Sequence, residues 1–367
     1  MTVSDRHGGD LYAAARELGR SPRHLIDFSA SINPLGPSKR AIRAAVKSLP
    51  LACHYPDATC HGLATALVSR WKLDPAHFVV GNGSSELIHL LPRALSIRHA
   101  LILGPTFSEY ARALSMQGSR MTYLHATRKD GYQIPLTQAC KALCTNRSRF
   151  DTLFLCNPNS PTGQVASSQD VLDLVDVAAR RKVWVVVDET FVDYCEAHSV
   201  LSAVVRSPRL LVLRSFTKFY ALPGLRTGYL AGSPEVVARI RRFQPPWSVN
   251  ALAQTAAQAA LKDRRHAQRS LVFMHRERAR LVKALRTIPG LHVFPSAANF
   301  FLVELPSSML AAHVTQTLRQ QGLLIRDCSA IPGLTDRTIR IAVRTTAENR
   351  RLVRALCQLL KACRPIH

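Results

Sequence analysis

The sequence predicts an α/β protein with a mainly parallel central sheet, helices on both of its faces and a smaller C-terminal α+β domain. Short apolar, β-branched segments alternate with amphipathic helical patterns through the first two thirds of the 367 residues. These segments are apolar throughout, which is typical of parallel strands that are buried on both faces. After Pro245 and Pro246 the pattern changes to long helices and a few late strands, which indicates a second domain.

The individual elements follow from the same patterns. Strands of the large sheet are predicted at residues 78–80, 100–103, 152–156, 183–187 and 210–213, with helices at 86–95, 109–116 and 169–180. The later part should contain helices at 252–261, 266–286 and 347–361 and strands at 300–303, 323–325 and 339–343. We therefore divide the chain into an N-terminal arm (1–45), a large domain (46–245) and a small C-terminal domain (246–367).

The charge balance is strongly basic, with 49 Lys and Arg against 24 Asp and Glu and a formal net charge of +25. Such a surface attracts anions. The cations are spread along the chain without a basic tail, a zinc-finger spacing or a helix-turn-helix segment. A nucleic-acid-binding regulator is therefore the weaker interpretation, we expect no specific nucleic acid as a partner, and a basic surface that favours anionic substrates is the better one.

No apolar run reaches the roughly 18 residues of a membrane helix, so we expect no membrane association. The first ten residues lack the apolar stretch of a signal peptide, so we expect the protein in the cytoplasm. The nine cysteines are an odd number in a long chain, which argues against a disulfide framework. Two adjacent pairs, Cys53-His54 and Cys60-His61, lack the two-residue ligand spacing of zinc folds, and we expect no metal.

Four polar segments follow predicted strands, at the edge where open parallel sheets bind ligands. The first, residues 81–86, is a glycine- and serine-containing turn into a helix, whose free N–H groups suit a phosphate. The second is Asp188, which ends a very apolar strand. A carboxylate there is costly unless it meets a positive partner, and a protonated pyridine nitrogen is such a partner.

The third segment places Ser215 and Lys218 after the strand at 210–213, with Arg226 a few residues later. A lysine with a lowered pKa can form an imine with an aldehyde cofactor. Ser215 and Arg226 supply a hydroxyl and a guanidinium for a cofactor phosphate. The fourth segment, residues 157–163, is a tight turn with polar side chains that follows the strand at 152–156.

Together these motifs resemble the aspartate-aminotransferase superfamily of pyridoxal-phosphate enzymes, known as fold type I, over nearly the whole chain. The resemblance rests on the order of the glycine-serine loop, Pro-Thr-Phe at 105–107, Asn-Pro-x-x-Pro-Thr-Gly at 157–163, Asp-Glu-x-Phe at 188–191, Ser-x-Thr-Lys at 215–218 and Arg-x-Gly at 226–228. It implies a mainly parallel sheet, a cofactor-binding large domain and pyridoxal phosphate as the cofactor.

The resemblance also implies roles for individual residues. Lys218 should bind the cofactor covalently, Asp188 should meet its pyridine nitrogen, and Phe107 should stack on its ring. The cofactor phosphate should be held by Ser84, Ser85, Ser215 and Arg226. Tyr55, in His-Tyr-Pro, matches a tyrosine that reaches the phosphate in the partner subunit, so a homodimer with shared active sites is implied.

Within the superfamily, the chain looks like two sister groups, the histidinol-phosphate aminotransferases and the threonine-phosphate decarboxylases. Three features favour the decarboxylases, which act in cobalamin biosynthesis. One is the arm, with His7-Gly8-Gly9 and residues 27–36, which should contribute His7 and Gly8 to substrate binding. The second is the lysine segment, residues 215–226. The third is Phe191, which stands where the aminotransferases usually carry a tyrosine hydroxyl near the cofactor's phenolic oxygen.

Two serines depart from the decarboxylase pattern. Ser31 replaces an asparagine that helps bind the substrate, and Ser160 replaces one that meets the cofactor oxygen and the substrate carboxylate. A serine hydroxyl is shorter and lacks the two donors of an amide. We expect the two changes to affect substrate choice, with Ser31 and Ser160 still at the substrate and Ser160 also at the cofactor.

In the small domain, Arg340 and Arg326 match two arginines that hold the substrate, Arg340 at the α-carboxylate and Arg326 at the phosphate. The sequence therefore predicts a pyridoxal-phosphate-dependent decarboxylase of O-phospho-L-threonine, which yields (R)-1-aminopropan-2-yl phosphate. The alternatives are a histidinol-phosphate aminotransferase and decarboxylation of serine phosphate, which differs from the predicted substrate by one methyl group.

Overall fold

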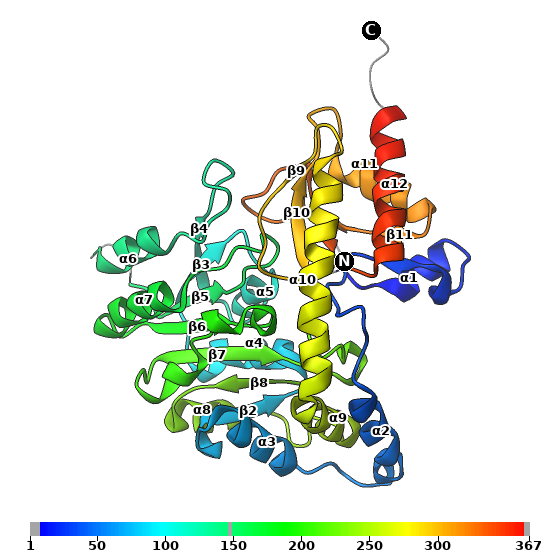
Figure 1. Cartoon of the computed structure of the whole chain (residues 1–367). Coiled ribbons are helices and arrows are strands. Elements are labelled where there is room, and N and C mark those ends of the chain that lie inside the picture. The colour runs from blue at the N-terminus through cyan, green and yellow to red at the C-terminus, as the bar shows by residue number, and fades with distance from the viewer. Residues whose placement is uncertain (1–7, 146–148, 363–367) are drawn as a thin grey trace.

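The computed structural model describes residues 8–145 and 149–362. A seven-stranded sheet forms the centre of the large domain (Figure 1). Its spatial order is β2-β8-β7-β6-β5-β3-β4, and all strands are parallel except β8, which is antiparallel to both neighbours. The strands are β2 (Phe78–Gly81), β3 (His99–Gly104), β4 (Arg120–His125), β5 (Thr152–Cys156), β6 (Trp184–Asp188), β7 (Leu210–Ser215) and β8 (Gly228–Ala231).

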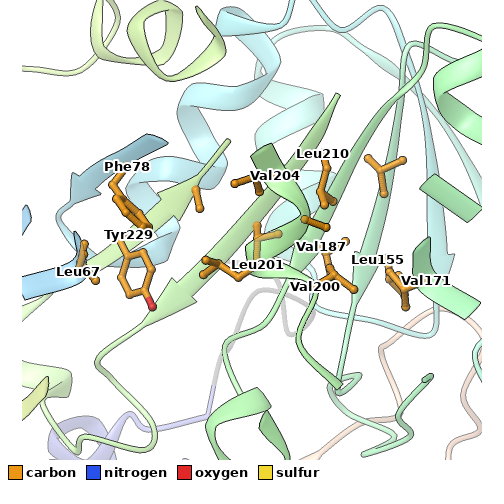
Figure 2. Packing of buried hydrophobic residues seen from close by; sticks show 14 of the residues in the cluster. Leu67, Phe78, Leu155, Val171, Val187, Val200, Leu201, Val204, Leu210 and Tyr229 are labelled. Carbon is orange, nitrogen blue, oxygen red and sulfur yellow. The ribbon is translucent and has the colours of Figure 1, made fainter. Parts of the chain in front are cut away.

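The helices lie in two layers because successive residues of each strand point to opposite faces. On one face, Val185 and Val187 belong to a core shared with α3 (His61–Trp71), α6 (Leu136–Cys144), α7 (Ser168–Arg180) and α9 (Ala251–Lys262). Figure 2 shows part of this core. On the other face, Val186 and Leu211 pack with α4 (Gly83–Ala94), α5 (Glu109–Met116) and α8 (Pro234–Arg241). The α/β fold with helices on both faces is therefore confirmed.

A four-stranded antiparallel sheet, β12-β13-β10-β9, forms the centre of the C-terminal part. Its strands are β9 (His292–Val293), β10 (Phe300–Glu304), β12 (Arg326–Asp327) and β13 (Thr338–Ala342). Three helices accompany it: α10 (Arg264–Arg286), α11 (Ala311–Gln320) and α12 (Thr346–Ala362). Figure 1 shows α10, in yellow, running from the large sheet to the small one.

The N-terminal segment contributes to both cores. After α1 (Leu11–Glu17), β1 (Ile26–Asp27) pairs in parallel with β11 (Leu323–Leu324), and Phe28 is fully buried in the core of the small sheet. Then α2 (Lys39–Lys47) packs against α9. The predicted arm is thus split between the two cores, with its first part on the C-terminal sheet.

The boundary predicted near residue 246 assigns α9 to the small domain. In the structure α9 packs against α2 and α3, and its alanines Ala253, Ala256, Ala257 and Ala260 belong to the core of the large sheet. Further along α10, Met274 and Leu281 belong to the core of the small sheet. We propose that the boundary lies within the first half of α10. Among the residues described, no helix is long and apolar enough to cross a membrane.

Candidate active site

A cavity of about 200 Å³ lies at the carboxyl ends of β5, β6 and β7, where the large sheet faces the small one. The parallel register brings these ends together, since Cys156 of β5 lies opposite Asp188 of β6. Most of the residues predicted for the site line this cavity: Gly8, Ser84, Ser85, Phe107, Ser160, Asp188, Ser215, Lys218, Arg226, Arg326 and Arg340.

Part of the cavity lining is a cradle at the start of α4. Gly83, the first residue of α4, has a φ of +78°, and a Cβ there would lie 2.5 Å from Nη2 of Arg226. A Cβ on Gly228 would lie 2.7 Å from the backbone nitrogen of Ser84. Glycine is therefore favoured at Gly83 by its positive φ and at Gly228 by close approach of the backbone. The two glycines leave the helix N–H groups, Ser84, Ser85 and the guanidinium around one small space, an arrangement that suits a phosphate.

The cavity lining also includes Asp188, which is 3% exposed. The Tyr110 hydroxyl donates to Asp188 Oδ2 at 2.7 Å, and the Thr190 backbone N–H donates to Oδ1 at 2.9 Å. Burial raises the pKa of Asp188, while these hydrogen bonds and the Lys218 charge oppose the rise. Among the described residues no cation forms an ion pair with this carboxylate, so it is suited to a cationic group of a ligand.

Lys218 lines the same cavity. Its pKa is lowered to about 8, first by burial and then by the charges of Arg340 and Arg226, against the opposing effect of Asp188. Its backbone carbonyl accepts a hydrogen bond from the Asn33 N–H at 3.0 Å, which attaches the lysine loop to the N-terminal segment. A lysine with such a pKa has a substantial neutral fraction near pH 8 and is a competent nucleophile.

The small sheet supplies Arg326 and Arg340, which are directly opposite each other in the antiparallel pair of β12 and β13. Both line the cavity. Arg340 donates from Nη1 to Ser160 Oγ at 2.9 Å and from Nη2 to the Ser29 carbonyl at 2.8 Å, while its Nε is buried without a partner. Burial lowers the pKa of Arg340, and the charge of Arg326 lowers it further. The site therefore concentrates positive charge on one wall.

Two predicted residues, Ser31 and Tyr55, do not line this cavity. Ser31 is fully buried outside the cavity lining, and its hydroxyl oxygen has no hydrogen-bond partner among the described residues. Tyr55 is 79% exposed and stacks on Trp247, with ring centroids 4.4 Å apart. His7 lies outside the described residues, whereas its neighbour Gly8 lines the cavity.

Several lining residues were given no individual role in the sequence analysis. Cys328 and Ile331 form an apolar wall beside Arg326, and Ser29 and Thr106 add hydroxyls. Tyr110 acts from α5 through its bond to Asp188. The spacing of Tyr110 three residues after Phe107 is a helical spacing that could have suggested it, but ordinary core packing has the same pattern.

The chain belongs to the aminotransferase class I and II family, which it matches over residues 23–356. It is a pyridoxal-phosphate-dependent enzyme. It is 38% identical to the threonine-phosphate decarboxylase of Salmonella typhimurium, over 98% of each chain. It is 33% identical to the histidinol-phosphate aminotransferase of Moorella thermoacetica, over 96% of this chain and 89% of that one.

Among solved structures, the chain resembles L-threonine-O-3-phosphate decarboxylase from Porphyromonas gingivalis, with a TM-score of 0.80 and 27% identity. The match covers 91% of this chain and 99% of that chain. The predicted cofactor and the fold-type-I architecture are therefore confirmed.

The residues of the cavity fit pyridoxal phosphate. The cradle at Gly83 presents Ser84, Ser85 and the Arg226 guanidinium to a phosphate, the buried Asp188 carboxylate suits a protonated ring nitrogen, and Lys218 lines the same cavity. Phe107 adds an aromatic face on the same cavity. These are the three chemical features that the cofactor requires: an anion site, a carboxylate and an amine.

Proposed function

We propose that the protein decarboxylates O-phospho-L-threonine to (R)-1-aminopropan-2-yl phosphate, a step in cobalamin biosynthesis. The observation that carries the proposal is the pair Arg326 and Arg340, which face each other across β12 and β13 and both line the cavity. Like charges directly opposite in a sheet destabilise it. A substrate with two anionic groups compensates this repulsion, and threonine phosphate has a carboxylate and a phosphate.

We assign the α-carboxylate to Arg340 and the phosphate to Arg326. Arg340 is held by Ser160 and by the Ser29 carbonyl, both neutral acceptors, so its charge is not cancelled before a substrate binds. The structure gives Arg326 no acidic partner among the described side chains. Charge-assisted hydrogen bonds from planar guanidinium groups orient a substrate as well as bind it.

For the cofactor, we propose that Lys218 binds its aldehyde, Asp188 contacts its ring nitrogen and Phe107 stacks on its ring. Its phosphate is assigned to the cradle of Ser84, Ser85, Ser215 and Arg226. When bound, the cofactor supplies an electron sink for the electron pair left by the departing carboxylate. The bonds from Tyr110 and Thr190 favour the ionised form of Asp188 against the effect of burial, and this carboxylate would stabilise the protonated state of the ring nitrogen.

Two further roles concern orientation and proton transfer. By gripping the two ends of the substrate, Arg340 and Arg326 fix the direction of the bond between Cα and the carboxylate. After carbon dioxide leaves, Cα needs a proton. The Lys218 amine lines the same cavity and has a pKa of about 8, so it is the group suited to hold that proton and deliver it to Cα.

The rival function is amino transfer from histidinol phosphate. The similarity to the Moorella thermoacetica enzyme supports it. Histidinol phosphate has a phosphate but no carboxylate, so it would leave one of the two arginines without an anion. Serine phosphate is a closer competitor because it lacks only a methyl group, a difference typically worth ~1–3 kcal/mol. The apolar wall of Cys328 and Ile331 is where that methyl group could be distinguished.

We also propose a homodimer in which Tyr55 reaches the cofactor phosphate of the partner subunit. Tyr55 is far more exposed than its aromatic character favours, and it does not line the cavity of its own chain. Other large apolar side chains from α2, the turn that follows it and the loop before α9 are exposed too: Ile42, Val46, Leu49, Leu51 and Trp247. A surface of this kind supports burial against a second copy. The cytoplasmic location stays a prediction.

One assay tests the function directly. The purified protein is incubated with pyridoxal phosphate and with threonine phosphate, serine phosphate or histidinol phosphate in turn. Release of carbon dioxide and dependence on an added keto acid are followed separately. We expect carbon dioxide from threonine phosphate without a keto acid. Keto-acid-dependent consumption of histidinol phosphate, with no carbon dioxide from the phospho-amino acids, would assign the protein to the rival function.

A further inference from the structure

A buried ion pair lies behind the proposed cofactor site. Glu189 follows Asp188 in the chain and Arg214 precedes Ser215, and the two side chains are 0% and 1% exposed. Arg214 Nε donates to Glu189 Oε2 at 2.8 Å. Because successive residues in an extended chain point to opposite sides, this pair lies across the chain from the side chains that the site uses.

Both members of the pair are fully engaged. Arg214 also donates from Nη2 to Ser199 Oγ at 2.9 Å and from Nη1 to Asp193 Oδ1 at 3.3 Å. Its guanidinium lies 4.8 Å from the centre of the Trp71 ring. Planar guanidinium groups held by several hydrogen-bond acceptors and an aromatic face have little freedom to move.

The carboxylate of Glu189 has further hydrogen-bond donors besides Arg214. It accepts hydrogen bonds from the Ser199 hydroxyl and the Val200 N–H, each at 2.7 Å. In addition, the Glu189 backbone N–H donates to the Leu213 carbonyl at 2.9 Å, which continues the parallel pairing of β6 and β7 beyond Asp188. The end of one strand is thus tied to the end of the next by backbone and side chain together.

Stability alone is a poor explanation for such a pair. The desolvation of two buried charges can exceed their attraction, and replacing a buried pair by apolar residues is often neutral. What the pair does provide is a fixed relation between the last residues of β6 and β7. We propose that Glu189 and Arg214 are positioning residues, which set the separation of Asp188 and Ser215 and hence the distance over which the cofactor's ring nitrogen and phosphate are held.

The inference rests on the proposed cofactor site and goes beyond it. If Asp188 and Ser215 contact opposite ends of one rigid molecule, a small shift between the strand ends weakens both contacts at once. The sensitive quantity is therefore the affinity for pyridoxal phosphate, together with the pH at which its visible absorption band titrates. Neither quantity depends on which substrate the enzyme decarboxylates.

The experiment uses the full-length chain, freed of cofactor and titrated with pyridoxal phosphate. The variants are Glu189→Gln, Arg214→Lys and the double change Glu189→Leu with Arg214→Met. The double change removes the charges of Glu189 and Arg214 together but takes the guanidinium partner from Asp193, so we expect it to unfold at a lower temperature than the wild type and to stay folded during the titration. Its dissociation constant for pyridoxal phosphate should rise about tenfold or more, with a shifted band titration.

Arg214→Lys tests the same idea if the double variant does not fold, because it keeps the charge and loses the planar fork. It too should bind the cofactor about tenfold more weakly. The matched control is Glu304→Gln in the small sheet, a buried glutamate paired with Arg337 at 3.0 Å and outside the cavity lining. This control should lower the unfolding temperature and leave cofactor affinity unchanged.

The outcomes separate the two proposals. Wild-type affinity and band titration in folded Arg214→Lys and double variants would overturn the positioning role. A wild-type protein that does not bind pyridoxal phosphate would instead overturn the cofactor site on which the inference rests.

Discussion

The hydroxyl of Tyr110 donates a hydrogen bond of 2.7 Å to Oδ2 of Asp188, and both side chains are buried. The Tyr110 ring stacks on Phe154 and meets the edge of Phe107, so its position is fixed by packing as well. This bond connects α5 to the end of β6. It replaces a hydrogen bond to water that the buried carboxylate cannot make. It also lowers the pKa of Asp188 against the effect of burial.

We expect Tyr110→Phe to weaken cofactor binding and to destabilise the fold. The change keeps the ring packing and leaves Asp188 Oδ2 without its donor, which typically costs ~1–3 kcal/mol. The pKa of Asp188 should rise, because a bond that favours the ionised form is lost. Thermal unfolding and titration with pyridoxal phosphate measure the two effects. Tyr123→Phe, on the Tyr123–His125 stack outside the cavity lining, is the control and should change neither.

The lowered pKa of Lys218 predicts a pH dependence for covalent attachment of the cofactor. Only the neutral amine attacks the aldehyde, and burial holds the pKa at about 8 instead of 10.5. Starting from cofactor-free enzyme, the attachment rate should rise about tenfold from pH 6 to pH 7 and level off above about pH 8. The visible band follows the rate, and borohydride reduction with peptide mapping locates the adduct at Lys218. An adduct at another lysine would contradict the assignment.

Alanine substitutions of Arg340 and Arg326 should reduce activity on different sets of substrates. Arg340→Ala should lower kcat/KM for every amino-acid substrate, because each has the α-carboxylate. Arg326→Ala should reduce it only for phosphorylated substrates. Each loss should be roughly 10- to 100-fold, as for a charge-assisted hydrogen bond worth ~1.5–3 kcal/mol. Binding of unphosphorylated threonine is the comparison that decides, and equal losses for both substrates in both variants would refute the assignment.

Phe191→Tyr should move the enzyme towards its aminotransferase relatives. Phe191 packs at the edge of Phe300, and its ring centre lies 5.9 Å from the Lys218 amine. A hydroxyl at this position is expected to donate to the cofactor's phenolic oxygen and so to lower the pH at which the visible band titrates. Spectrophotometric titration measures this shift, and a keto-acid assay measures any amino transfer. An unchanged titration would mean that position 191 does not reach the cofactor.

The shared site can be tested by complementation. Chains with Tyr55→Ala and chains with Lys218→Ala are each expected to be weakly active or inactive alone. Mixing them in equal amounts under exchange should restore about a quarter of wild-type activity, because half of the dimers then contain one intact site of two. Sedimentation reports the dimer independently. Dimers that exchange without any recovery would place Tyr55 outside the partner's site.

Much of the fold follows from local patterns. The strands β5, β6 and β7 each have an apolar, buried central run, and each ends at or just before a polar motif. The two strands of the large sheet that were not predicted lack this pattern. β4 lies at the sheet edge with only partial burial, and β8 is four residues long and begins inside the Arg-x-Gly motif. Its antiparallel direction depends on pairing with β2, about 150 residues earlier, which no local pattern encodes.

For this protein, the sequence by itself determined which chemical groups end the strands: Asp188, Lys218, Ser215 and Arg226 stand in motifs whose types and order indicate their chemistry. Only the tertiary structure decided how these groups are held. The opposition of Arg326 and Arg340, the bond from Tyr110 to Asp188 and the pair of Glu189 with Arg214 are contacts set by strand register and helix docking. Their free energy depends on burial and on distances between residues far apart in the chain, and these exist only once the chain is folded.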